Sequence, residues 1–328
     1  MPATREQPEV ARPELASLDA DVNGPLIACV DDGPGGRATA RLADSLATRL
    51  ESELLLATVR PARLRPTIDG DIDRNLIRDA GAVLACAAAE LDRPAELRVA
   101  FGEPAERLLA LASRERASLI VVGRPARQSL TTAPLGNVYL ALAGTAPCPA
   151  VVVPPGAEQN ASGPIVCGFD GSEPSLRAAR VAADLARRLG VRLTIVHVLA
   201  GLGISDSTAG AGGEQASAHA NELSAIRMLR RAAAQLCRPP EIDLVVDHGA
   251  PADRLAQIAE RESAQLLVTA SGGSSGNAPT LLGPVTSRLA GVSRTPCPIV
   301  PPGADRRVPD PHDMEPRAHY AGSRGVAV

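Results

Sequence analysis

Residues 24–33 read GPLIACVDDG, and residues 163–172 read GPIVCGFDGS. Three more pairs of segments recur in the same order: FGEPAERLLALA with HGAPADRLAQIA, ASLIVVGRPA with AQLLVTASGG, and APCPAVVVPPGA with TPCPIVPPGA. The copies lie about 140 to 150 residues apart, a period that is too long for a solenoid and fits a whole domain. The sequence therefore predicts one domain present twice in a chain of 328 residues.

Each copy alternates short apolar runs with helical patterns. The runs show no polar alternation, which is typical of strands that are buried on both faces. Alternating strands and helices favour parallel strands with right-handed crossovers, so we expect an α/β fold of two doubly wound domains, each with a five-stranded parallel sheet flanked by helices. The strands expected in the first copy are Leu26–Val30, Leu54–Val59, Leu97–Phe101, Leu119–Val122 and Ala150–Val153.

The helical patterns place apolar side chains on one face. The clearest sets are Leu42, Leu46 and Leu50 in the first copy, and Ala178, Ala182, Leu185 and Leu189 in the second. By contrast, the Gly-, Ala- and Ser-rich residues 201–215 are expected to hold no single shape.

The repeat also predicts the domain boundaries. We expect the first domain at residues 24–156 and the second at 163–303, with a polar linker at 157–162. Residues 1–23 and 304–328 are rich in Pro, Arg and Asp without periodicity, and we expect both to be disordered tails.

Composition excludes several kinds of chemistry. All 34 basic residues are Arg, so a Walker-type phosphate-binding Lys and a Schiff-base Lys are excluded. The net charge is −3, the two signs are interleaved, and aromatic residues make up 1% of the chain, which disfavours nucleic-acid binding.

The six Cys form no CxxC pair or metal-ligand spacing, and we interpret them as small buried side chains in a reducing compartment, with Cys148 and Cys297 in turns. Residues 1–24 have no apolar core of the kind that a signal peptide requires, and no apolar run is long enough to span a bilayer. We therefore expect a cytoplasmic protein without a membrane partner.

Acidic residues follow the first strand of each copy. In an open parallel sheet, ligands bind at the carboxyl ends of the strands, where the strand order reverses. Asp31 and Asp170 lie at that position and could accept hydrogen bonds from a ribose hydroxyl or an adenine amino group. The alternative is that each Asp only forms the turn or the cap before the first helix.

A loop follows the fourth strand of each copy. Gly allows the close backbone approach that a phosphate needs, and a helix N-terminus behind the loop adds N–H donors. In the first copy the loop also carries polar side chains that could contact phosphate or could simply be solvated: Arg124, Arg127, Ser129, Thr131 and Thr132.

This layout resembles the universal stress protein family in its tandem form. The resemblance rests on the strand that ends in Asp, on the GEPAERL and GAPADRL steps, and on the closing APCPAVVV and TPCPIV, and it covers nearly all of the patterned chain. It implies a Rossmann-like fold, a role in the stress response and, in the nucleotide-binding branch, a loop with Gly, two residues, Gly, nine residues, and Gly followed by Ser or Thr.

The spacing of that motif is kept here, although not every residue is. In the first copy Gly123 and Gly136 match, while Ala126 replaces the middle Gly and Asn137 replaces the hydroxyl residue. In the second copy Gly273 and Gly283 match, while Ala270 replaces the first Gly and Pro284 the hydroxyl residue. Because Pro284 has neither an N–H nor a polar side chain, the resemblance implies ATP binding mainly in the first copy. The cofactor-binding residues carried over are Asp31, Val59, Gly123, Ala126, Gly136, Asn137 and Val138 in the first copy, and Asp170, Val198, Gly273 and Gly283 in the second.

No catalytic constellation stands out. We interpret His197 as a packed or hydrogen-bonded side chain, and His248 has no Ser or Cys nucleophile in a matching motif. We therefore expect a non-enzymatic protein without a metal and with protein partners that the sequence does not identify. The alternative is a weak ATPase or another nucleotide-processing enzyme.

The last strand of each copy bears on assembly. In this family the fifth strands commonly pair across a two-fold axis, and the apolar AVVV would be a liability as an exposed edge. We expect the two halves to form an intramolecular pseudo-dimer through these strands, with only Ile299 and Val300 available in the second copy. Further association into a homodimer through helix faces stays open.

Overall fold

The computed structural model describes residues 24–60, 71–124, 138–157, 160–200, 211–236, 240–273, 282–302, 304 and 326–327. The first half contains β1 (Leu26–Cys29), α1 (Pro34–Arg49), β2 (Leu54–Arg60), α2 (Asp71–Ala88), β3 (Glu96–Phe101), α3 (Pro104–Arg114), β4 (Leu119–Gly123), α4 (Val138–Thr145) and β5 (Ala150–Val153). The five strands expected in this half are confirmed.

The second half repeats this order. It contains β6 (Ile165–Gly168), α5 (Glu173–Leu189), β7 (Leu193–Leu199), α6 (Ala211–Ala233), β8 (Ile242–His248), α7 (Pro251–Arg261), β9 (Leu266–Ala270), α8 (Pro284–Val292) and β10 (Cys297–Val300). The apolar faces predicted for α1 and α5 are buried as expected: Leu42, Leu46, Leu50, Ala178, Ala182, Leu185 and Leu189.

The strands of both halves form a single sheet. Its order is β11-β3-β2-β1-β4-β5-β10-β9-β6-β7-β8, where β11 is the two-residue strand Val326–Ala327. Within each half all neighbouring strands are parallel. The order reverses between β1 and β4 in the first half and between β6 and β9 in the second, as in a doubly wound fold.

The two halves join through their fifth strands. β10 pairs antiparallel with β5, and Cys297, Pro298 and Ile299 lie opposite Val152, Val151 and Ala150. The strand pairing expected from the sequence is therefore present. The expected extent of β10 was wrong, however, because Cys297 begins the strand and does not lie in a turn. Pro298 is tolerated since pairing with β9 starts only at Ile299.

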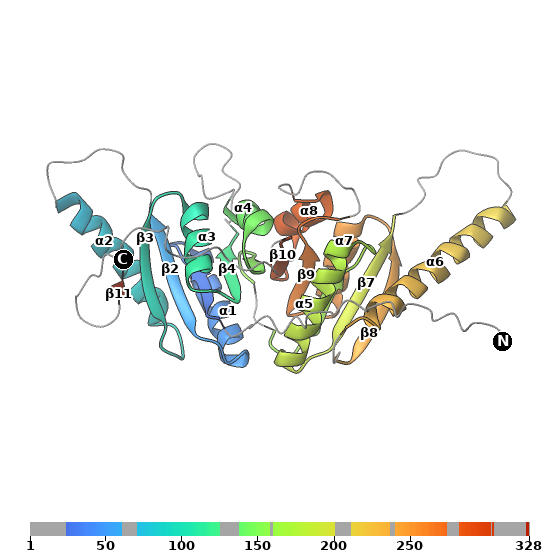
Figure 1. Ribbon diagram of the computed structural model, residues 1–328, viewed down its shortest axis with the longest axis horizontal. Helices are drawn as coiled ribbons and strands as arrows, with labels where there is room; N and C mark the ends of the chain where they lie inside the picture. The colour runs from blue at the N-terminus through green and yellow to red at the C-terminus, as the bar shows by residue number, and fades with distance from the viewer. Residues whose placement is uncertain are drawn as a thin grey trace, which may run out of the picture.

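Two hydrophobic cores cover the two faces of the sheet, and each core contains residues from both halves. One core packs under α1, α2, α5 and α6, and the other under α3, α4, α7 and α8. Figure 1 shows α4 and α8 near the centre of the molecule and α2 and α6 at its two ends. Ala is frequent in these cores, which brings the helices close to the sheet.

Two segments differ from expectation. Residues 201–210 lie outside the described residues, but α6 begins at Ala211, so residues 211–215 are helical and not shapeless. The packed C-terminal part of α6 supplies the nucleus, after which extension gains one hydrogen bond per residue. In the C-terminal segment, Val326 and Ala327 pair with Leu97 and Arg98.

A reciprocal contact joins α1 to α5. Arg49 Nη2 donates to the carbonyl of Leu189 at 3.0 Å, and Arg188 Nη2 donates to the carbonyl of Leu50 at 2.7 Å. In the alignment that pairs residues 24–33 with 163–172, Arg188 is the counterpart of Arg49 and Leu189 of Leu50. The halves therefore meet as two copies do across a two-fold axis, where each contact occurs twice.

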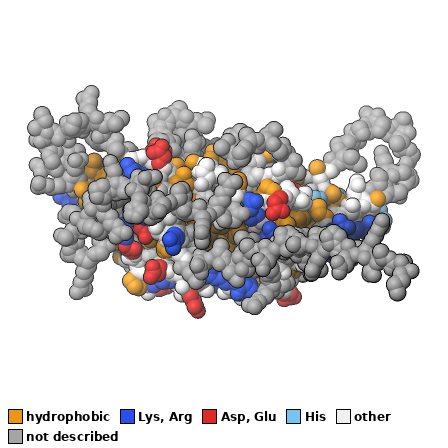
Figure 2. Space-filling model, in the orientation of Figure 1, with side chains coloured by type: hydrophobic (Ala, Val, Ile, Leu, Met, Phe, Trp, Pro, Cys, Tyr) orange, Lys and Arg blue, Asp and Glu red, His pale blue; other side chains and the backbone are white. Residues whose placement is uncertain are grey.

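The visible surface carries both signs of charge. Where Figure 2 shows described side chains, Arg and acidic side chains are interspersed over most of the view, and basic side chains gather toward its right-hand end. No helix in the described part of the chain is long and apolar enough to cross a membrane.

Candidate functional site

In the first half, the turn after β1 lies at the carboxyl edge of the sheet beside the strand reversal. Asp31 is exposed, and its Oδ1 accepts a hydrogen bond from the backbone N–H of Gly33 at 3.0 Å. Gly33 caps α1 without a side-chain bond. Asp31 thus forms the turn before α1 while its side chain stays at the edge, so the two roles weighed from the sequence are compatible.

The end of β4 packs closely against this turn. A Cβ atom on Gly123 would lie 2.9 Å from Thr39 Oγ1 and 3.4 Å from the carbonyl oxygen of Gly35. Thr39 Oγ1 itself donates to that carbonyl at 2.8 Å. Gly is therefore favoured at residue 123, because the Thr39 hydroxyl occupies the space that a Cβ would need and the backbone of Gly35 lies close by.

The second half builds the same edge with different contacts. Asp170 Oδ1 accepts hydrogen bonds from the backbone N–H of Ser172 at 3.0 Å and from the Ser172 hydroxyl. Ser172 in turn caps α5 by accepting from the N–H of Ser175. A Cβ on Gly273 would lie 2.8 Å from Asp170 Oδ2, so the structure brings Asp170 and Gly273 together as predicted.

The start of α8 is hydrogen-bonded to the end of β9 within the second half. The backbone N–H of Gly283 donates to the carbonyl of Ser271 at 2.8 Å, and Thr286 Oγ1 donates to the carbonyl of Ala270 at 2.7 Å. Gly283 caps α8, and Pro284 takes its first position. An N–H that a phosphate-binding loop would direct at its ligand is thus already bonded here.

Arg124 does not lie free for a phosphate. Its Nη1 donates to the carbonyl of Ala290 in α8 at 3.0 Å, so this side chain joins the first half to the second. Burial lowers the pKa of the Arg124 guanidinium, against the opposing influence of Tyr139 and Cys297. The sequence alone placed Arg124 in the loop but could not show that the other half lies beside it.

The remaining predicted residues fall into two groups. Val59 is partly buried at the end of β2, Val198 is buried near the end of β7, and Val138 is buried at the start of α4. These three belong to the same core face as α3, α4, α7 and α8. The loop residues lie outside the described residues: Ala126, Arg127, Ser129, Thr131, Thr132, Gly136 and Asn137.

The side chain of His197 has a structural partner, whereas His248 is bonded through its backbone N–H. His197 Nδ1 lies 2.7 Å from the carbonyl oxygen of Phe169, which confirms the interpretation of a hydrogen-bonded side chain. The N–H of His248 donates to Asp247, whose carboxylate also binds Arg254. Burial acts to raise the pKa of Asp247, but the N–H of His248 and the Arg254 guanidinium outweigh it, so the pKa lies below its usual value.

Cys148, Cys167 and Cys297 are buried as expected and Cys29 is partly buried, but Cys86 is exposed on α2, so the expectation of a buried side chain was wrong there. Among the described residues, no group of three His, Cys, Asp or Glu side chains lies close enough to hold a metal. Burial raises the pKa of the Cys148 and Cys167 thiols to about 12. Such thiols are not nucleophilic near neutral pH.

Sequence reasoning missed the first turn of α1. Thr39 and Gly35 form the wall against which Gly123 packs, and neither was predicted to contribute to the edge. The run DDGPGGR, which opens this turn, was the available signal, because successive Gly residues mark a place where two backbones approach each other.

Known proteins share this architecture. A universal stress protein of Mycobacterium tuberculosis is 30% identical over 220 residues, which is 65% of this chain and 72% of that protein. One of Mycolicibacterium smegmatis is 33% identical over 205 residues, or 61% of this chain and 67% of that protein. The crystal structure of a universal stress protein from Archaeoglobus fulgidus shares the fold with a TM-score of 0.56 and 14% identity, covering 85% of this chain and 96% of that one.

The sequence profile described as "Universal stress protein family" matches the chain twice, at residues 23–154 and 162–301. Together these matches span most of the 328 residues and coincide with the two halves of the sheet. The chain therefore belongs to the universal stress protein family and carries two of its domains.

Proposed function

We propose that this protein acts in the stress response without catalysing a reaction, and that its first domain binds an adenine nucleotide such as ATP. The observation that carries the proposal is the contact of Gly123 with Gly35 and Thr39, beside the exposed Asp31. It brings the strand ends together where the strand order reverses, which is where doubly wound folds bind ligands.

The second domain supports the proposed difference between the halves. There the N–H of Gly283 is bonded to Ser271, and Pro284 offers no donor. The nucleotide site of the second domain is therefore proposed to be the weaker one, even though Asp170 and Gly273 are close together.

Thermal unfolding in the presence of ATP tests this proposal. A ligand that binds only the folded state stabilises it by about 2.7 kcal/mol at a concentration one hundred times Kd. We expect ATP to raise the melting temperature, Gly136→Val to abolish the increase, and the matched variant Gly283→Val to retain it. A Cβ on Gly283 lies 3.7 Å from the carbonyl oxygen of Ser271, so this control has room. Unchanged melting at millimolar ATP would refute nucleotide binding.

The remaining alternative is a weak ATPase or another nucleotide-processing enzyme. Phosphoryl-transfer sites commonly contain a Lys and a bound metal ion. The sequence has no Lys, and the described residues contain no cluster of His, Cys, Asp and Glu suited to hold a metal. Release of inorganic phosphate from ATP should stay at the buffer rate. A rate that falls to the buffer rate in Gly136→Val would favour the enzyme.

The partners, the cytoplasmic location, the boundaries at residues 157–162 and further association into a homodimer stay predictions. Pull-down from stressed cells, fractionation and light scattering are the measurements that test them.

A further inference from the structure

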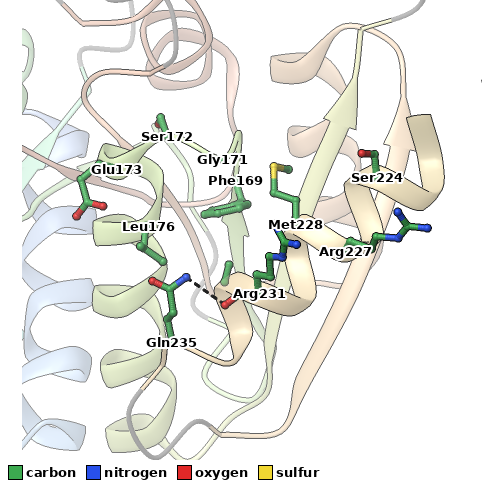
Figure 3. A pocket seen from close by; sticks show the side chains of 11 residues that line it. Phe169, Gly171, Ser172, Glu173, Leu176, Ser224, Arg227, Met228, Arg231 and Gln235 are labelled. Carbon is green, nitrogen blue, oxygen red and sulfur yellow. Dashed lines mark hydrogen bonds between the residues drawn. The ribbon is translucent and has the colours of Figure 1, made fainter. Parts of the chain in front are cut away.

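A cavity of about 350 Å³ lies between α5 and α6 in the second domain. Figure 3 shows Phe169, Leu176 and Met228 around it, with Arg231 from α6 and Gln235 from the turn that follows α6. Its volume falls at the lower end of the range for small-molecule sites.

This cavity adjoins the turn after β6, because Gly171 and Ser172 line it next to Asp170, but it lies on the α5 and α6 face of the sheet. Its apolar lining belongs to the core under α5 and α6, whereas Val198 belongs to the core on the opposite face of the sheet. Gly273 and Gly283 do not line it.

The basic side chains at the cavity lack acidic partners. Arg227 and Arg231 are exposed and four residues apart on α6, and neither guanidinium is bonded to a carboxylate within the described ranges. Like charges at this spacing destabilise a helix, and a bound anion would offset that repulsion.

The acidic residue in the lining does not neutralise this pair. Glu173 Oε1 lies 3.4 Å from Arg180 Nη1, and Figure 3 shows the Glu173 carboxylate directed away from α6. Arg231 is therefore the basic side chain directed at the cavity, whereas Figure 3 shows the Arg227 guanidinium turned away from Phe169 and Leu176.

The apolar part of the cavity is fixed by close packing. Phe169 is 7% exposed, and Leu176 and Met228 are partly buried against the same core. Met228 Sδ lies 2.5 Å from the place that a Cβ on Gly171 would take, so the absence of a side chain at Gly171 lets Met228 rest there. In the first half the counterpart of Gly171 is Asp32, whose carboxylate would repel an anion.

We propose that this cavity binds a small organic anion. Arg231 contacts the anionic group, Arg227 adds positive charge nearby, and a short hydrocarbon part packs against Phe169, Leu176 and Met228. Charge-assisted hydrogen bonds from Arg orient the anionic group, and contact of the hydrocarbon part with the apolar side chains adds to the affinity.

The three Met residues make a direct test available. They are Met1, Met228 and Met314, so ¹³C-methyl labelling of Met gives one signal from the cavity and two from segments outside the described residues. Octanoate serves as the amphipathic anion, octylamine as the same tail with the opposite charge, and inorganic phosphate as an anion without a tail. We expect octanoate to shift the Met228 signal saturably, and octylamine and phosphate to leave it nearly unchanged.

Matched variants locate the anionic contact. Arg227→Gln/Arg231→Gln should weaken octanoate binding by roughly tenfold or more, as loss of charge-assisted bonds implies. Arg230→Gln is the control, because Arg230 is also exposed on α6 but does not line the cavity. An unmoved Met228 signal at about 10 mM octanoate, an equal response to octylamine, or an equal loss in Arg230→Gln would overturn the proposal.

Discussion

Gly123 and Thr39 in the first domain have Ala270 and Ala178 as their counterparts in the second. In the first pair, the larger side chain of Thr39 takes the space that Gly123 leaves open. In the second pair, two small side chains of equal size lie in one buried core. The two domains thus fill the space between the first helix and the fourth strand differently: the first uses one large and one absent side chain, and the second uses two small ones.

This difference in packing predicts that substitutions at Gly123 and Thr39 affect stability in a coupled way. Gly123→Ala should lower the free energy of unfolding by about 1–3 kcal/mol, because its Cβ meets Thr39 Oγ1 in a packed region. Adding Thr39→Ala should recover part of that loss, so the two changes should be non-additive by about 1 kcal/mol. Urea denaturation of the two single variants and the double variant measures these changes in the free energy of unfolding. Gly272→Ala is the control, since nothing lies within 4 Å of its Cβ, and purely additive losses would contradict the interpretation.

The ion pair of Asp247 with Arg254 leads us to predict that the stability of the protein depends on pH. Because its pKa is lowered in the folded protein, the pair with Arg254 stabilises the protein above the unfolded pKa of about 3.9 and ceases to do so as pH falls through the folded pKa. Asp247→Asn should therefore cost about 1 kcal/mol or less at pH 7, where solvent screens the partly exposed pair, and nothing at low pH.

Denaturation of wild type and Asp247→Asn from neutral to acidic pH measures this difference. Asp243→Asn serves as the comparison, because Asp243 and Arg192 are both about half exposed, at 45% and 48% of their side-chain area. A loss that persists unchanged at the lowest pH would mean that charge is not the cause.

The helices that follow the first strand of each half begin differently. α5 has Ser172 as its cap, with the hydroxyl accepting from Ser175, whereas α1 begins after Gly33 without a side-chain cap. Gly33 and Ser172 hold equivalent places, since each backbone N–H donates to the Asp two residues earlier at 3.0 Å, so the difference is the hydroxyl that Gly33 lacks.

Removing the cap of α5 should therefore have a graded effect. Ser172→Ala should lower the free energy of unfolding by about 1 kcal/mol, and Ser172→Gly, which copies α1, by only a few tenths. Urea denaturation with helix content followed by circular dichroism checks both values. Equal losses in the two variants would show that the hydroxyl contributes through another contact.

At the scale of elements, local patterns predicted the strands well because each strand is a short apolar run covered on both faces. They failed at Ala211–Gln215, where the packing of the rest of α6 overrides the low helix propensity of two Gly residues. They also failed at Pro298. The sequence pattern excludes this residue from a strand, but in the structure it lies in β10 and is paired with β5. At the site, the expected strand order placed Asp170 and Gly273 at the same edge of the sheet, but the bond from Arg124 to Ala290 depends on how the halves join.

Across the whole molecule, the reciprocal bonds of Arg49 and Arg188 make equivalent contributions to the joint between the halves. Arg49 also donates from Nη1 to Gln265 Oε1 at 2.7 Å, and burial lowers the pKa of its guanidinium. Bonds from a charged donor to a partly buried carbonyl contribute about 1–2 kcal/mol each.

Arg188→Ala should therefore destabilise the chain by about 1–2 kcal/mol, Arg49→Ala by somewhat more because it also loses the bond to Gln265, and the double variant by about 3 kcal/mol. Arg41→Ala should change stability little, because the Arg41 side chain is 61% exposed in its pair with Glu90. Equilibrium unfolding compares the four proteins. A large loss in only one of the two single variants would mean that the joint is not symmetric in energy.

The antiparallel joint of β5 and β10 has a consequence for how such a protein can change. In a dimer of two identical subunits, every mutation is present in both subunits. A residue that suits the ligand site of one subunit must therefore also occupy the site of the other. Here a single chain supplies both partners at a fixed ratio that dilution cannot alter. One half can therefore lose or acquire a ligand while the other keeps its own, and Pro284 and Asp32 are differences of this kind.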